Sequence, residues 1–122
     1  PWALRNSYIN VILDRTDTTS LLQQFTSTAL PTATIVRLSR LLEAQRYCQA
    51  MYTSCGWFFE DLSRIETRNN IGYASMAIEQ VRLATGIDLA SDFRSDLSAA
   101  RSWITDQTGQ DIYDRIINQR KI

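Results

Sequence analysis

Carboxylates follow directly on an aromatic run in the middle of the chain. Glu60 and Asp61 come after residues 57–59, which are Trp-Phe-Phe, and Glu66 lies a little further on. Two carboxylates held at the right separation can act as acid and base, or as acid and nucleophile, in glycoside hydrolysis. The alternative is that they are first-turn helix charges, partly paired with nearby arginines. Nothing else in the sequence supports catalysis, so we expect no catalytic residue here and a site whose reactive groups lie elsewhere.

The aromatic run is itself difficult to bury on one helix. Consecutive side chains lie about 100° apart around a helix axis, so one face cannot cover three of them. At least one ring therefore faces a groove, a partner or another domain, unless all three fill the junction between two helices. Trp57 is the best candidate for ligand contact, because an indole offers a broad apolar face and one N–H donor, which suits a sugar ring. Trp2 and Trp103 are expected to be packing residues.

The residue types that the chain lacks exclude several kinds of site. There is no His, which removes Ser-His-Asp and Cys-His catalysis and histidine-ligated metal sites from anything this chain does alone. Cys48 and Cys55 cannot form a structural zinc site without other ligands, and on one helix they would lie too far apart for a disulfide. We expect two unpaired, buried thiols, with Cys55 structural at the end of a helix. We expect no metal and no cofactor.

Charge and hydropathy point away from nucleic acid and membranes. The chain has 13 basic and 13 acidic residues, so no net field attracts either partner. No segment approaches the roughly 18 continuous apolar residues of a membrane span, and no signal peptide is visible. Unpaired thiols suit a reducing compartment, so we expect a cytoplasmic protein. Because the chain begins at Pro1 without an initiator Met, we expect it to be a fragment of a longer protein.

Helical periodicity runs through almost every segment, and none alternates as a strand does. The sequence therefore predicts one all-α domain over residues 1–122, a bundle of about five or six helices. The expected helices cover about 2–14, a short stretch for which residues 17–19 (Asp-Thr-Thr) offer N-cap oxygens, a long stretch from Thr34 towards Tyr52, and stretches that begin at Glu66, at Asp88 or Ser91, and after Gly109.

Glycines mark the expected ends of these helices. Gly56 is placed to end the long third helix in a left-handed conformation, and Gly86 to end the fourth. Asn69, Asn70 and Gly72 are poor helix formers, so the first turn and a half of the fourth helix is expected to be irregular.

Several stretches together resemble a known family. The most specific is 51–63 (MYTSCGWFFEDLS), with 41–46 (LLEAQR) before it and 65–67 (IET) after it. These stretches resemble an uncharacterised helical domain found C-terminal to catalytic domains of the family-57 glycoside hydrolase type. Weaker similarity near both ends extends the resemblance over nearly the whole chain. The polar stretch 68–72 departs from the family's usual continuation.

This resemblance implies a parent protein with an N-terminal (β/α)-type barrel that acts on α-glucan-like or related polysaccharides. The catalytic carboxylates belong to that barrel, and the helical domain packs on it and completes the cleft with an aromatic residue. Trp57 would be that residue, and its neighbours in the cleft would be Phe58, Glu60, Asp61 and Glu66. The implied partners are the barrel of the same chain and a polysaccharide.

Three hypotheses about function follow. The first is an accessory domain of a glycoside hydrolase or glucanotransferase, inactive alone, that helps to shape a glycan cleft. The second is a helical docking or structural module that holds the barrel or a second subunit and touches no sugar. The third, an autonomous enzyme, is disfavoured. An exposed Trp57 beside Glu60 and Asp61 would favour cleft lining, whereas a buried Trp57 would favour docking.

Overall fold

A computed structural model describes residues 1–58 and 61–120. Its helices in chain order are α1 (Trp2–Ser7), α2 (Ile9–Ile12), α3 (Thr18–Gln23), α4 (Thr32–Ala50), α5 (Cys55–Phe58), α6 (Ile65–Thr85), α7 (Ala90–Leu97) and α8 (Gly109–Arg120). The prediction of an all-α domain is confirmed, because these residues contain no strand and only an isolated bridge in the loop before α8. The segments outnumber the prediction because the expected first helix breaks at Tyr8 and the single turn α5 stands apart from α4.

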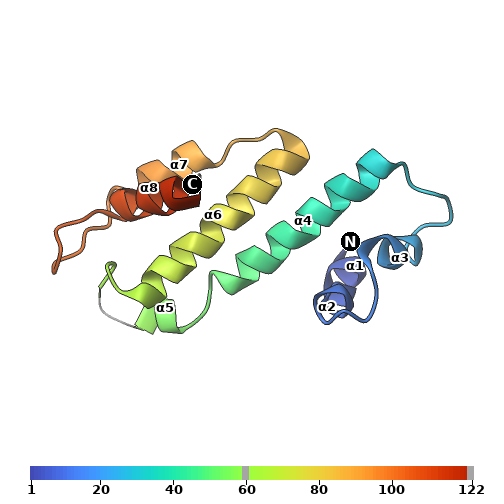
Figure 1. Cartoon of the computed structure of the whole chain (residues 1–122), viewed down its shortest axis with the longest axis horizontal. Coiled ribbons are helices and arrows are strands. Elements are labelled where there is room, and N and C mark those ends of the chain that lie inside the picture. Colours follow the sequence, from blue (N-terminus) through green and yellow to red (C-terminus); the bar gives the residue numbers. More distant parts are fainter. Residues whose placement is uncertain (59–60, 121–122) are drawn as a thin grey trace.

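The long helices α4 and α6 form the centre of the molecule and run side by side in opposite directions (Figure 1). Both bury alanines, Ala44 on α4 and Ala74 and Ala77 on α6, and such small side chains let two helix axes approach closely. The short helices α1 to α3 lie on the α4 side (Figure 1). On the other side α8 packs on α6, and α7 packs on α8. The turn α5 sits at the end of the α4–α6 hairpin, where the chain passes from one long helix to the other.

Two separate apolar clusters flank this hairpin. The first joins Tyr8, Leu21, Leu22 and Leu42, so it fastens α3 and the break between α1 and α2 to α4. The second joins Ile71, Ile112 and Tyr113, so it fastens α8 to α6. In the second cluster the ring of Phe93 on α7 meets that of Tyr113 edge-on, with centroids 5.7 Å apart, a favoured geometry for aromatic pairs.

Several helix ends follow local signals. The carboxylate of Asp17 caps α3 and accepts from the Ser20 N–H at 2.9 Å, as predicted. Gly86 ends α6 with φ of 76°, the left-handed conformation predicted for it. At the start of α8, Thr108 and Asp111 cap each other reciprocally, side chain to backbone N–H. These ends need no distant partner.

Two predictions about the turn region were wrong. Gly56 does not end α4 in a left-handed conformation: it lies buried inside α5, where its Cα packs against Asn70. The start of α6 is regular from Ile65 onward, although its residues are poor helix formers. Asn70 is buried there and donates from Nδ2 to the Thr53 carbonyl at 3.1 Å, so a tertiary contact outweighs the local preference.

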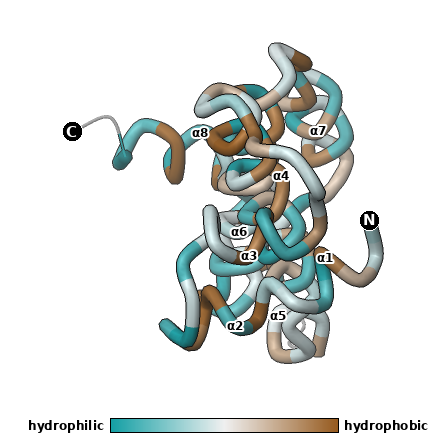
Figure 2. Tube along the Cα trace, turned by 90° about the vertical axis from the view of Figure 1, so that its right-hand side faces the viewer, coloured by the Kyte–Doolittle hydropathy of each residue, from teal (hydrophilic) through white to brown (hydrophobic). Residues whose placement is uncertain are grey.

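Hydropathy is mixed along the whole described chain. Within residues 1–58 and 61–120, no helix has both the length and the apolar character that a membrane crossing requires. Short hydrophobic stretches alternate with hydrophilic ones along the tube (Figure 2). This alternation is what helices with one covered face and one solvated face require.

Candidate functional site: an aromatic-rimmed cavity

An open cavity of about 650 Å³ lies beside the α4–α5 turn. Its walls come from this turn, from α5 and α6, and from α7 with the loop that follows it. Four aromatic side chains contribute to the lining, namely Tyr52, Trp57, Phe93 and Trp103. Its size falls within the roughly 300–1,000 Å³ of small-molecule sites, which are also mostly apolar with a few placed polar groups.

Trp57 presents an indole face to solvent at the edge of this cavity. Its side chain is 69% exposed and stacks on Tyr52, with ring centroids 6.0 Å apart and planes 11° apart. The indole Nε1 donates to the Met51 carbonyl at 3.3 Å, so the ring's one polar donor is engaged within the chain. Two nearly parallel rings therefore form one fixed aromatic surface.

The prediction that at least one ring of the aromatic run points outward is confirmed. Trp57 is exposed and Phe58 is 82% exposed, while Phe59 lies outside the described residues. The physical reason is the shortness of α5, which is a single turn packed mainly on α6 at the end of the hairpin. Within α5, Gly56 is the buried residue, and a single turn leaves Trp57 and Phe58 exposed.

The structure corrects the expectation for the other two tryptophans. Trp103 is 74% exposed and lines the cavity, so it is no packing residue. Trp2 is also exposed, and the Arg5 guanidinium lies 4.8 Å from the centre of its ring. Trp103 is the site residue that sequence reasoning missed. It stands on the loop between α7 and α8, 46 positions beyond Trp57, and no local pattern joins the two.

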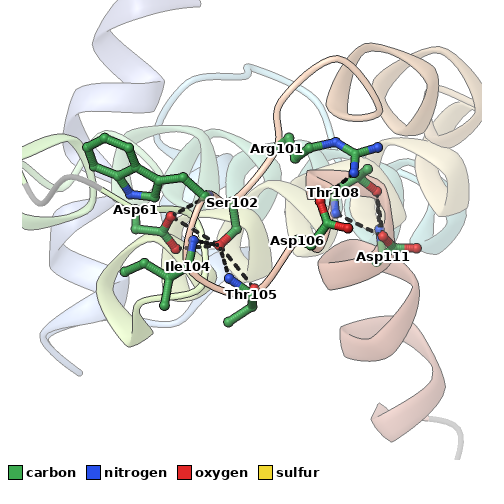
Figure 3. A network of polar contacts seen from close by, with 9 residues as sticks. Asp61, Arg101, Ser102, Ile104, Thr105, Asp106, Thr108 and Asp111 are labelled. Carbon is green, nitrogen blue, oxygen red and sulfur yellow. Dashed lines mark hydrogen bonds and ion pairs between the residues drawn. The ribbon is translucent and has the colours of Figure 1, made fainter.

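Asp61 lies on the cavity wall but is turned inward and only 4% exposed. Its Oδ1 accepts from the Ser63 N–H at 2.8 Å, from Ser63 Oγ at 2.6 Å and from Ser102 Oγ at 2.8 Å. Its Oδ2 accepts from the Trp103 N–H at 3.1 Å. Figure 3 shows this carboxylate facing Ser102, across the gap between the α5–α6 connection and the α7–α8 loop. Asp61 therefore joins two segments of the chain.

These contacts decide the ionisation of Asp61. Burial alone raises the pKa of a carboxyl group, but the hydrogen bonds from Ser63, Ser102 and the Trp103 N–H outweigh it and lower the pKa to about 2. The group is therefore ionised at neutral pH, with its oxygens occupied by donors. A carboxylate in this state cannot donate a proton as a general acid.

Glu66 is not part of the cavity lining. Its enclosed Oε2 lies 3.4 Å from Arg64 Nε, in line with the alternative that Glu66 is a first-turn helix charge paired with an arginine. A hydrogen bond from its own backbone N–H, together with Arg64, lowers the pKa of Glu66. Glu60 lies outside the described residues. Of the predicted site residues, the structure thus brings Trp57 and Asp61 to the cavity and leaves Phe58 and Glu66 beside it.

One comparison places the chain in a family. A family model described as a domain of unknown function, DUF3536, matches residues 1–122. The chain belongs to the DUF3536 family. No curated protein and no solved structure matches it.

The cysteines of this DUF3536 domain are unpaired. Cys48 is half-buried, and burial raises the pKa of its thiol. Cys55 is exposed and begins α5, which corrects the expectation of a buried thiol at a helix end. Over the described parts of the domain, no three metal-ligating side chains gather closely enough to hold an ion.

Asp61→Asn should lower the Tm of the DUF3536 domain by roughly 5–10 °C at pH 7, because an amide satisfies fewer of the surrounding donors. The folded pKa of Asp61 lies below the ordinary 3.8. The stability that its ionised form adds is therefore present above about pH 4 and disappears as the pH falls towards about 2. Circular dichroism melts should show the gap between variant and wild type narrowing over this interval.

The matched control is Asp96→Asn, which changes an exposed carboxylate on α7. It should shift the Tm by less than about 2 °C, both at pH 7 and between pH 4 and pH 2. A gap for Asp61→Asn that stays constant between pH 4 and pH 2 would contradict the assignment of the lowered pKa to this carboxyl group.

Proposed function

We propose that this DUF3536 domain is an accessory helical domain of a cytoplasmic, glycoside hydrolase-like enzyme of the family-57 type. In this proposal it packs on the catalytic barrel of the same chain, and its aromatic-rimmed cavity lines the glycan cleft. The link to family 57 rests on the sequence resemblance and is an argument by analogy. The stacked Tyr52–Trp57 pair carries the assignment of a site, because its exposed indole face is what a sugar ring stacks on.

The arrangement of polar groups suits a stacking role. The cavity lining includes Asp61 and Asn70, whose side chains are engaged with Ser102 and with the Thr53 carbonyl. Trp57 has likewise used its N–H within the chain. The cavity therefore offers mainly aromatic and aliphatic surface, and the hydroxyl groups of a bound sugar would bond to water or to the barrel.

The chemistry of the site also supports an accessory rather than a catalytic role. Its described carboxylate, Asp61, is ionised at neutral pH and serves Ser63, Ser102 and Trp103 as an acceptor. Glycoside hydrolysis needs one carboxyl group that holds a proton. We therefore place the reactive groups in the barrel and give this domain the task of positioning the sugar.

The second candidate function is docking without sugar contact. Apolar side chains remain exposed outside the cavity, and Phe58, Ile65 and Ile104 are the clearest of them. Such side chains favour a protein neighbour when they form a contiguous surface. In this reading Phe58→Ala weakens the attachment of the domain to the barrel, and Trp57 has no role of its own in turnover.

Trp57→Ala in the full-length protein should reduce turnover of an α-glucan about tenfold, the loss expected for one stacking contact of one to two kcal/mol. The Tm should stay within a few degrees, because the indole is mostly exposed and little packing is lost. Steady-state assays with a soluble α-glucan, combined with thermal melts, measure both quantities. Trp2→Ala removes an exposed tryptophan away from the cavity and serves as the control. Loss of folding with unchanged specific activity would refute cleft lining.

A further inference from the structure

We infer that Trp103 is a second ligand-contact residue of the cavity and that Asp61 is the residue that positions it. The inference rests on the proposed function, because it adds residues to the same site. Trp103 is largely exposed, yet its backbone N–H donates to a carboxylate that is almost completely buried.

The loop that carries Trp103 is closed at its base by backbone hydrogen bonds. The Gly109 N–H donates to the Ala100 carbonyl at 2.9 Å, and the Ser102 N–H donates to the Gln107 carbonyl at 2.8 Å. Inside the loop, Ser102 Oγ accepts from the Thr105 N–H at 3.0 Å. Trp103 therefore stands on an ordered turn.

The hydroxyl of Ser102 connects this loop to the segment between α5 and α6. It donates to Asp61 at 2.8 Å while it accepts from the Ile104 and Thr105 N–H groups (Figure 3). Trp103 and Ile104 bury little surface of their own, so apolar packing does not fix the loop. A buried carboxylate is tolerated when donors surround it, and these donors come from both segments. The hydrogen bonds that Asp61 accepts from Ser102 Oγ and from the Trp103 N–H thus fix the backbone of Trp103.

This arrangement prepares the cavity for a ligand with apolar ring faces. Trp57, backed by Tyr52, comes from the α5 side, and Trp103 comes from the α7–α8 loop. The indole of Trp57 and the backbone of Trp103 are held before any ligand binds, so binding does not have to order them, which lowers its entropic cost. The cationic side chain of the lining, Arg101, is paired with Asp106 at 2.6 Å, so the cavity suits an uncharged ring such as a neutral pyranose.

The first test measures maltoheptaose binding to the full-length protein by calorimetry. Trp103→Ala should weaken binding at least fivefold, as should Trp57→Ala, while Trp2→Ala leaves it unchanged. If Trp57→Ala weakens binding and Trp103→Ala does not, the inference fails and the proposed function stands. If the wild-type protein does not bind maltoheptaose, both fail.

The second test addresses positioning. Ser102→Ala removes the side-chain hydrogen bond from this loop to Asp61 and should weaken binding about as much as Trp103→Ala, whereas Ser63→Ala removes a different donor to the same carboxylate and should change binding less than twofold. The double variant Ser102→Ala/Trp103→Ala should bind no more weakly than Trp103→Ala alone. In protein labelled with 5-fluorotryptophan, the fluorine resonance of residue 103 should shift or broaden in Ser102→Ala and not in Ser63→Ala. Additive losses, or an unchanged resonance, would overturn the positioning role.

Discussion

Gly56→Ala is expected to destabilise the domain by about 3 kcal/mol, although alanine is the better helix former. A Cβ at position 56 would overlap the side-chain amide of Asn70, which is buried and cannot swing into solvent without losing its bond to the Thr53 carbonyl. The cost therefore combines steric strain with a broken buried hydrogen bond. Urea unfolding followed by circular dichroism measures the free energy of unfolding directly.

Two further variants make this prediction specific. Gly72 also lies within a helix, but a Cβ there would meet only Arg120 Nη2 at an ordinary 3.7 Å. Gly72→Ala should therefore stabilise the domain by about 0.5–1 kcal/mol, the opposite sign. In the double variant Gly56→Ala/Asn70→Ala the overlap disappears, so its destabilisation should be well below the sum of the single changes. Additive effects would show that contact with Asn70 is not the reason for glycine at position 56.

Leu21→Ala should cost about 3 kcal/mol, because Leu21 is 1% exposed at the centre of the first apolar cluster. That cluster joins α1, α2 and α3 to α4, while a separate cluster joins α6 to α8. The variant should therefore lose amide protection in α3 before α8. Hydrogen exchange measured by mass spectrometry, alongside urea unfolding, resolves the two regions.

The control for this prediction is Leu13→Ala, which shortens an exposed leucine just after α2. It should change the free energy of unfolding by less than about 0.5 kcal/mol. Equal and simultaneous loss of protection in α3 and α8 of the Leu21→Ala variant would mean that the two clusters unfold as one unit.

The position of the cavity follows from the order of the elements. The packed helices α4 and α6 form the centre of the domain, and the single turn α5 connects them at one end. Within α5 only the Gly56 side is buried, so its other side chains face outward. The α7–α8 loop returns to the same end and is tied there by Asp61. The cavity therefore lies at the end of two packed helices. One of its walls is the α4–α5 turn and the other is the anchored α7–α8 loop, and each wall carries an exposed aromatic ring.

Local interactions made much of the fold predictable from the sequence. Helical periodicity predicted the all-α class, and Asp17 and Gly86 predicted a helix start and a helix end, because a cap depends on residues within one turn. These features depend on neighbours in the chain, so reading the chain in order was enough. For the aromatic run the sequence left two alternatives open, an outward ring or a filled helix junction, and the exposure of Trp57 and Phe58 decides for the first.

The roles of Gly56, Asp61 and Trp103 were decided by tertiary structure alone. Gly56 is required by Asn70, and Asp61 takes its donors from Ser102 and Trp103, more than 40 positions away. The sequence indicated a carboxylate beside an aromatic run and so predicted a cleft residue. Folding surrounded that carboxylate with donors from a distant loop, so its oxygens are engaged with Ser102 and the Trp103 N–H. The aromatic run set one wall of the cavity, and long-range contacts supplied the other.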